Sequence, residues 1–228
     1  MRSLILRFED CEGPGLLEPL LREKGYSITY HDAFRNGLNL LPSTHLLFDF
    51  FLFLGGSDSV YDPTKKSFFS PYFYLIEDIL RIQGKKILGI CLGSQLLAHV
   101  LGGTVARGDK GGEIGFGKLK IEEKENKIFY GIDGDEITGF HFHNDIFSLP
   151  KGSKKLLSSE KYENQMFSYN DSAIGILPHF ELTSAMFSVW RKKFMEIKNS
   201  VPENQEMFTQ LKLQKVSGEI LLRNILSL

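Results

Sequence analysis

Short apolar runs alternate with amphipathic stretches through the first hundred residues. A run of four to eight apolar residues is typical of a buried strand, whereas apolar positions spaced three and four apart are typical of a helix. These patterns predict strand, helix, strand, strand and helix over residues 3–8, 16–21, 27–30, 46–54 and 71–83. Such an alternation favours a parallel sheet that is covered by helices on both faces.

The pattern changes abruptly around Cys91. Residues 87–90 predict a buried strand, and from Leu92 onward the apolar positions recur at helical spacing. Cys91 therefore lies in a tight strand-to-helix turn between Gly89 and Gly93, where small residues allow the close backbone approach. The helix directs free N–H groups toward the thiol, which favours a thiolate. We interpret the turn as a nucleophile elbow that carries cysteine.

The second half of the chain has a different sequence pattern. A glycine-rich stretch, 108–117, is followed by strand-like runs, which predict antiparallel additions at one side of the sheet; these runs cover residues 118–121, 127–130 and 137–142. A further strand is predicted over 173–177, and helices are predicted over 183–198 and within 202–228. We expect one domain over residues 1–228, with a helical C-terminal extension over 195–228.

Composition limits the class of protein. The chain has 228 residues, of which 42% are hydrophobic and 24% charged, so we expect an ordinary globular protein. A formal net charge of −1 gives no electrostatic signal for nucleic acid or for an anionic membrane surface. The two cysteines predict no disulfide framework and favour a reducing compartment. No apolar run approaches the ~20 residues of a membrane span, and Arg7 interrupts the N-terminal run, so we expect a cytoplasmic location.

A cysteine nucleophile requires a base, and the base requires an orienting group. Among six histidines, His179 follows the predicted strand 173–177 and precedes Glu181 by two positions. Residues i and i+2 share a face at an extended strand end, so these two side chains can hydrogen-bond. We predict that His179 is the base and Glu181 the orienting acid, with His143 as the next candidate for the base.

Two motifs resemble those of one family. Residues 89–95, Gly-Ile-Cys-Leu-Gly-Ser-Gln, resemble the nucleophile motif of class I (triad-type) glutamine amidotransferases. Residues 175–181, Gly-Ile-Leu-Pro-His-Phe-Glu, resemble the second signature of that family, Gly-x-Gln-Phe-His-Pro-Glu. Cys91, His179 and Glu181 fall on the nucleophile, base and acid of the catalytic triad. Leu177 and Pro178 stand where the family has Gln and Phe, and Phe180 stands where it has Pro.

Further stretches agree with this resemblance. Residues 55–57, Gly-Gly-Ser, resemble the oxyanion loop, which implies that the backbone N–H groups of Gly56 and Leu92 hold the oxyanion. Residues 143–145 resemble the His-Gly-Asp stretch that lines the pocket for the α-amino and α-carboxylate groups of glutamine, with Asn144 in place of glycine. The implied substrate-binding residues are Gln95, His143, Asn144 and Asp145.

The resemblance covers residues 40–190 and is closest to stand-alone chains similar to the amidotransferase domain of GMP synthase. It implies a doubly wound, flavodoxin-like α/β fold with a mostly parallel central sheet. The implied reaction is hydrolysis of the side-chain amide of L-glutamine to glutamate and ammonia through a cysteinyl γ-glutamyl thioester. No metal or organic cofactor is implied, and the ammonia would pass to an acceptor activated by a separate synthetase.

Two alternatives remain open at this point. One is a γ-glutamyl hydrolase or peptidase that uses the same Cys-His-Glu triad on a larger conjugate. The other is a non-catalytic regulatory module of the same fold, which is favoured by the departures from the motifs at Asn144 and Pro178. Release of glutamate from a small panel of γ-glutamyl compounds would distinguish them.

Overall fold

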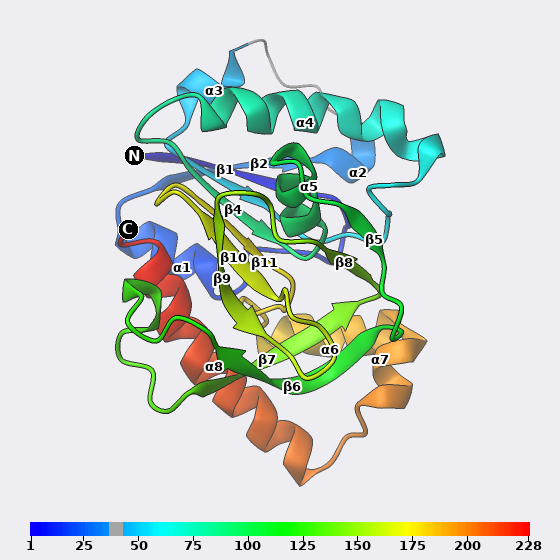
Figure 1. Cartoon of the computed structure of the whole chain (residues 1–228). Helices are drawn as coiled ribbons and strands as arrows, with labels where there is room; N and C mark the ends of the chain where they lie inside the picture. The colour runs from blue at the N-terminus through cyan, green and yellow to red at the C-terminus, as the bar shows by residue number, and fades with distance from the viewer. Residues whose placement is uncertain (37–42) are drawn as a thin grey trace.

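A central mixed sheet organises the molecule (Figure 1). The computed structural model describes residues 1–36 and 43–228; the expected start of the motif-bearing region near residue 40 lies outside them. Within the described residues, nine strands form the order β2-β1-β3-β4-β11-β10-β9-β6-β7. The first five in this order are parallel: β2 (Ser27–Asp32), β1 (Arg2–Arg7), β3 (Phe50–Phe53), β4 (Lys86–Ile90) and β11 (Ala173–Ile176).

The other strands are antiparallel additions, as expected. They are β10 (Met166–Tyr169), β9 (Ser153–Ser158), β6 (Glu113–Ile121) and β7 (Glu136–His143). A separate two-stranded sheet pairs β5 (Val105–Arg107) with β8 (Asp145–Phe147). The helices are α1 (Leu17–Glu23), α2 (Ala33–Asn36), α3 (Thr44–Leu47), α4 (Lys66–Leu80), α5 (Leu92–Val100), α6 (Ser184–Lys193), α7 (Met195–Ser200) and α8 (Gln205–Ile225). Short 3₁₀ helices occupy Pro63–Lys65 and Lys127–Phe129.

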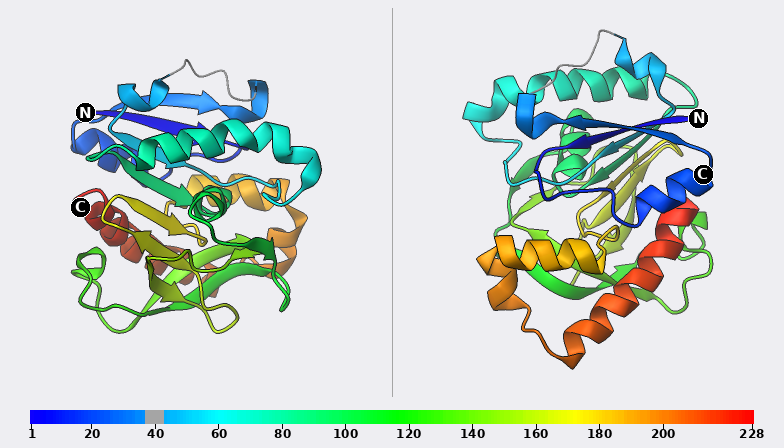
Figure 2. Two further views of the ribbon diagram at one scale, coloured as in Figure 1. Left: turned by 45° about the horizontal axis from the view of Figure 1, so that its top comes forward. Right: turned by 180° about the vertical axis from the view of Figure 1, so that it is seen from behind.

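Helices cover both faces of the parallel part, which confirms the expected α/β fold. Successive side chains of a strand point to opposite faces, so Leu4 and Leu6 of β1 pack with α4 and α5, whereas Ile5 packs with α1 and α8. A third apolar cluster, which includes Phe140 and Trp190, joins β7 to α6, α7 and the first half of α8. Figure 2 shows the C-terminal end of α8 next to α1, and α8 also contacts β7, so the C-terminal helix belongs to the body of the fold.

Several boundaries differ from the sequence-based expectations. Helix α4 begins at Lys66 and carries Pro71 inside it, because Phe69, two residues before the proline, is fully buried in the core. Residues 127–130 are not a strand: Asn126 accepts a hydrogen bond from the N–H of Ile128 and caps a 3₁₀ helix. No helix in the described parts of the chain is long and apolar enough to cross a membrane.

Candidate active site

Cys91 occupies the turn between β4 and α5, as the sequence predicted. Its backbone has φ 51° and ψ −112°, a conformation that L-residues rarely adopt. Gly89 and Gly93 are required here: a Cβ on Gly89 would lie 2.4 Å from the carbonyl oxygen of Gly93, and a Cβ on Gly93 would lie 2.0 Å from that of Phe53. Backbone hydrogen bonds from Cys91 to Ile176 O and from Gly93 to Leu54 O fix the turn between neighbouring strands.

Gly56 and Leu92, the two predicted oxyanion donors, lie side by side. A Cβ on Gly56 would approach the Leu92 side chain to 2.8 Å and Phe8 Cβ to 2.9 Å, so only glycine fits at this position without displacing a neighbour. The loop that follows β3 therefore lies against the first residue of α5. Electrostatic stabilisation of an oxyanion needs N–H groups close to each other and to the nucleophile, so this proximity is compatible with the predicted role.

His179 and Glu181 form a fully buried pair. His179 Nδ1 donates to Glu181 Oε1 at 2.7 Å, and the His179 ring packs edge-to-face on Trp190 at 4.8 Å between centroids. The pair lies in a turn beyond β11 and not in an extended strand. Backbone hydrogen bonds from Leu177 to Gln165 O and from His179 to Phe140 O hold both sides of Pro178, so the missing N–H of this proline leaves the segment anchored.

The thiol and the imidazole are neighbours without a closed hydrogen bond. Cys91 Sγ is directed to the carbonyl oxygen of Phe142 at 3.8 Å, and His179 Nε2 is buried without a hydrogen-bond partner among the described atoms. Burial disfavours the imidazolium, but the Glu181 carboxylate and the nearby Cys91 sulfur outweigh it and raise the pKa of His179 well above its usual range. The His179 ring, the predicted base, is therefore suited to carry a proton beside the thiol.

The predicted substrate residues Gln95 and Asp145 meet across the cavity. Gln95 Nε2 donates to the backbone oxygen of Asp145 at 3.4 Å. The Asp145 carboxylate accepts hydrogen bonds from Ser59 Oγ at 2.6 Å and from Tyr61 OH at 3.0 Å. Both donors come from the loop that begins at Gly56, so the predicted oxyanion loop and the predicted substrate stretch are tied together.

His143 and Asn144 lie in the same stretch but face different surroundings. The His143 ring is buried; its Nε2 lies 3.3 Å from Glu113 Oε2, and its Nδ1 has no hydrogen-bond partner among the described atoms. Asn144 is exposed, and its backbone oxygen accepts a hydrogen bond from Gly108. A Cβ on Gly112 would lie 2.3 Å from the Asn144 side-chain oxygen, so the preceding glycine-rich loop accommodates Asn144.

One cavity of about 310 Å³ collects these residues, which is within the usual size range of a small-ligand site. Its described lining includes Gly56, Cys91, Gln95, residues 143–145 and His179. The lining is acidic, because the cavity also meets the carboxyl groups of Glu9, Glu12, Asp58 and Glu196. Phe194 and Glu196 come from the C-terminal region, whose contribution the motifs did not predict.

Glu12 is a second residue that sequence reasoning missed. It is buried in the loop after β1, and its Oε2 has no hydrogen-bond partner among the described atoms. Burial raises the pKa of Glu12 to about 7, although the nearby His179 charge opposes the shift. A Cβ on Gly55 would lie 2.9 Å from Glu12 Oε1, which puts this carboxyl group against the predicted oxyanion loop. The sequence feature that could have identified Glu12 is its position just after a predicted strand, because the carboxyl edge of a parallel sheet is where ligands bind in such folds.

Helix α8 supports the base from behind. The side chain of Gln214, which is fully buried, donates to the carbonyl oxygens of His179 at 3.2 Å and Phe180 at 2.9 Å. Gly218 lets the helix approach closely, since a Cβ there would lie 2.5 Å from Phe180 O. On the opposite side, a Cβ on Gly15 would lie 1.9 Å from Glu181 O. The base segment is thus enclosed by both terminal parts of the chain.

Comparison with known proteins agrees with the geometry. The profile of the family described as glutamine amidotransferase class-I matches residues 20–186, well over half of the chain. The solved structure of a glutamine amidotransferase from Thermotoga maritima has 32% sequence identity and a TM-score of 0.86, and the match covers 100% of this chain and 96% of that one.

Two curated relatives share part of the sequence. γ-Glutamyl peptidase 4 of Arabidopsis thaliana is 38% identical over 102 residues, which cover 42% of this chain and 40% of the peptidase. A glutamine-hydrolysing GMP synthase subunit of Sulfolobus acidocaldarius is 36% identical over 137 residues, which cover 59% of this chain and 68% of that protein. The matched segment therefore spans less than half of the plant peptidase.

Proposed function

The chain belongs to the class I glutamine amidotransferase family, and from this premise we propose that it hydrolyses the side-chain amide of L-glutamine. Cys91 is the nucleophile, His179 the general acid and base, and Glu181 the group that orients His179. The observation that carries the proposal is the buried His179–Glu181 hydrogen bond of 2.7 Å in the same cavity as the strained Cys91 turn.

The reaction has two halves. The Cys91 thiolate attacks the amide carbon, and the N–H groups of Gly56 and Leu92 stabilise the oxyanion. His179, which holds a proton on Nε2, gives it to the leaving nitrogen, so ammonia departs and a γ-glutamyl thioester remains. Water then attacks the thioester while His179 accepts its proton, which releases glutamate and restores the thiolate and the protonated imidazole. Glu181 holds the imidazolium on its Nδ1 side throughout.

The charge of the cavity supports an α-amino acid substrate. The α-ammonium group of glutamine is cationic, and the cavity presents carboxyl groups from several elements, whereas its described lining contains no lysine or arginine. We assign Asp145 to the ammonium, because its carboxylate is held by Ser59 and Tyr61 at the inner wall. Gln95 orients the backbone of the same residue.

A γ-glutamyl peptidase reaction is the second candidate. It is favoured by the similarity to the plant γ-glutamyl peptidase and by the cavity wall at Phe194 and Glu196, which borders space that a larger leaving group could fill. The two activities share every step and differ only in the leaving group. Glutamine releases ammonia, whereas a γ-glutamyl conjugate releases an amino acid or a peptide through its amine. As a glutaminase, the chain would work beside a separate synthetase that consumes the ammonia.

Steady-state release of glutamate tests the proposal. The purified chain is given free glutamine and two γ-glutamyl dipeptides, beside the variants Cys91→Ala, His179→Ala and Glu181→Gln. We expect no turnover for Cys91→Ala, a loss of about 10²–10⁴-fold for His179→Ala and a smaller loss for Glu181→Gln. His99→Ala, a change at an exposed histidine on α5, is the matched control.

Four outcomes are informative. Turnover of glutamine identifies a glutaminase, whereas turnover of the dipeptides alone identifies the peptidase. Near-normal activity of His179→Ala would refute the assigned base and make His143 the candidate. If the unmodified chain forms no thioester with any of these compounds, the proposed function is wrong and the non-catalytic module is the better account.

A further inference from the structure

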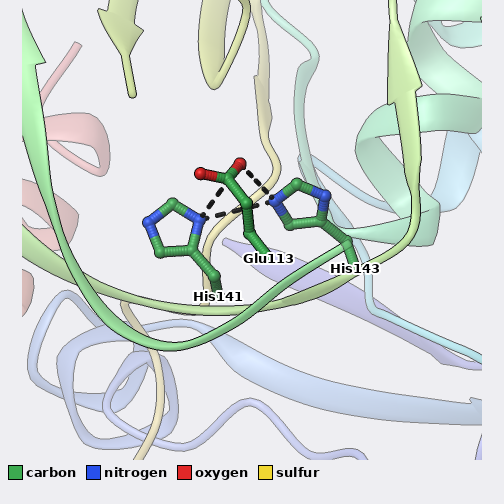
Figure 3. A group of neighbouring side chains, drawn as sticks. All are labelled: Glu113, His141 and His143. Atoms are coloured by element: carbon green, nitrogen blue, oxygen red, sulfur yellow. Dashed lines mark hydrogen bonds and ion pairs between the residues drawn. The ribbon is translucent and has the colours of Figure 1, made fainter. Parts of the chain in front are cut away.

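A second cluster of titratable side chains lies behind the predicted substrate stretch. Glu113 begins β6, and His141 and His143 lie at the end of β7, which pairs with it (Figure 3). The three side chains point toward one another: Glu113 Oε2 lies 3.3 Å from His143 Nε2 and 3.8 Å from His141 Nδ1, and the two ring nitrogens are 3.4 Å apart. Both rings are almost completely buried.

Hydrogen bonds alone explain the three interatomic distances poorly. Good N–H···O hydrogen bonds span about 2.7–3.2 Å, and all three separations are longer. A tetrahedral ion with bonds of about 2.0–2.1 Å requires its ligand atoms to be about 3.3–3.4 Å apart, which matches two of the three separations.

The surroundings suit a metal as well. Gln165 Nε2 donates to the same Glu113 oxygen and to none of the rings, which is how outer residues usually hold a ligating carboxylate. Glu113 and His141 line a groove of about 1020 Å³ whose described lining does not include Cys91, so an ion has a route to the cluster.

We propose that Glu113, His141 and His143 form a binding site for a divalent transition-metal ion, with Zn²⁺ as the preferred ion. Two imidazole nitrogens and one carboxylate oxygen select zinc over Mg²⁺ or Ca²⁺, which take oxygen ligands. Three protein ligands leave the fourth position open toward the groove, where water or a small anion completes the tetrahedron.

The ion would join two strands next to the candidate active site. It links the start of β6 to the end of β7, one residue before Asn144 and two before Asp145. Bound metal would therefore hold the substrate stretch in place without touching Cys91. The motifs of the nucleophile and the base implied no metal, and the proposal depends only on the three side chains that the β6–β7 pairing brings together.

Metal titration tests the site. The full chain with Cys11→Ser and Cys91→Ala, which removes the competing thiols, is stripped with a chelator and titrated with Zn²⁺ against a chromophoric competitor. We expect one tight equivalent and a rise in melting temperature. Zinc X-ray absorption should show nitrogen and oxygen ligands only, with the scattering pattern of two imidazoles.

Variants assign the ligands. In the same background, His141→Gln and Glu113→Gln should weaken zinc binding by at least about 100-fold, since loss of an outer partner alone costs 10–100-fold. His99→Gln should bind as the parent does. Circular dichroism of the metal-free variants establishes that they are folded. The proposal is overturned if the folded parent binds no zinc, if His141→Gln binds as tightly as the parent, or if the absorption spectrum shows fewer than two imidazoles.

Discussion

Two carboxyl groups share the interior of the candidate active site, and they differ in what surrounds them. Glu181 Oε1 accepts a hydrogen bond from His179, and one oxygen of each carboxyl group has no hydrogen-bond partner among the described atoms. Burial raises the pKa of Glu12 to about 7. Burial disfavours the charged form of a carboxyl group. Glu12 therefore changes its charge near neutral pH, immediately beside the imidazole of the base.

Glu12 should make stability depend on pH. Below about pH 4.5, its ordinary pKa, the carboxyl group is protonated in both the folded and the unfolded chain. Between about 4.5 and 7 only the unfolded chain ionises, so the free energy of unfolding falls as pH rises, by a few kcal/mol in all. The Glu12→Gln variant should not show this fall in unfolding free energy, and it should be more stable than the parent at pH 8.

Urea unfolding of both proteins at pH 4.5, 6 and 8 measures the effect. The difference in unfolding free energy between Glu12→Gln and the parent should grow steadily across this range. Glu125→Gln, which changes an exposed carboxyl group, is the control and should follow the parent. Equal pH profiles for Glu12→Gln and the parent would show that Glu12 titrates near its ordinary value in the folded chain.

Among the elements, α8 has the most unexpected role. The sequence predicted a helical C-terminal extension without a function, and the structure packs this helix on the backbone of the base segment through Gln214 and Gly218. We infer that Gln214 is a positioning residue. It touches neither substrate nor thiol, and it acts by holding the carbonyl groups on either side of the His179–Phe180 peptide.

Gln214→Ala should lower stability by about 2–3 kcal/mol, because it leaves two buried carbonyl oxygens without their donor. It should also lower kcat by about tenfold or more with little change in KM, since a displaced base affects the chemical step more than binding. Gln205→Ala, at an exposed position of the same helix, should change stability by less than about 0.5 kcal/mol. An unchanged kcat in Gln214→Ala would reduce its role to packing.

Local sequence patterns predicted the turn that holds the candidate nucleophile. They did not predict the residues and elements that pack around the candidate site. The turn at Cys91 could be predicted because apolar spacing switches from strand to helix between two glycines. The 3₁₀ helix at 127–129 could not, because so short an apolar run fits a short strand equally well. Glu12 and Gln214 were missed for a different reason. Each contacts residues more than thirty positions away in the sequence, and a local sequence pattern cannot predict a contact over that separation.

At the scale of the whole molecule, the candidate site is an assembly of separate regions. The loop after β1 supplies Glu12, the central strands supply Cys91 and His179, and the C-terminal region supplies Phe194 and Glu196. A surface network also ties these regions together: Ser57 donates to Glu9, and Lys193 of α6 contacts both Glu9 and Asp10. The oxyanion loop is therefore held partly by exposed ionic contacts, which are individually weak.

We expect low basal activity from the chain on its own. The Cys91 thiol contacts Phe142 O at 3.8 Å, and the oxyanion loop depends partly on exposed contacts, so a docked synthetase would raise kcat more than it lowers KM. Steady-state kinetics on the purified chain check this, with Cys91→Ala as the blank. A kcat within the ordinary range of about 1–10³ s⁻¹ on any γ-glutamyl compound would exclude the need for a partner.

The backbone of Cys91 bears on how this sequence has been selected. A non-glycine residue at such a conformation costs about 1–3 kcal/mol, and glycine would adopt φ 51° with less strain. In a protein that used the fold only as a scaffold, mutation of this cysteine to glycine would relieve the backbone strain without loss of function. If Cys91 is the nucleophile, selection for reactivity would favour the thiol at this strained backbone position, whereas selection for stability alone would favour glycine.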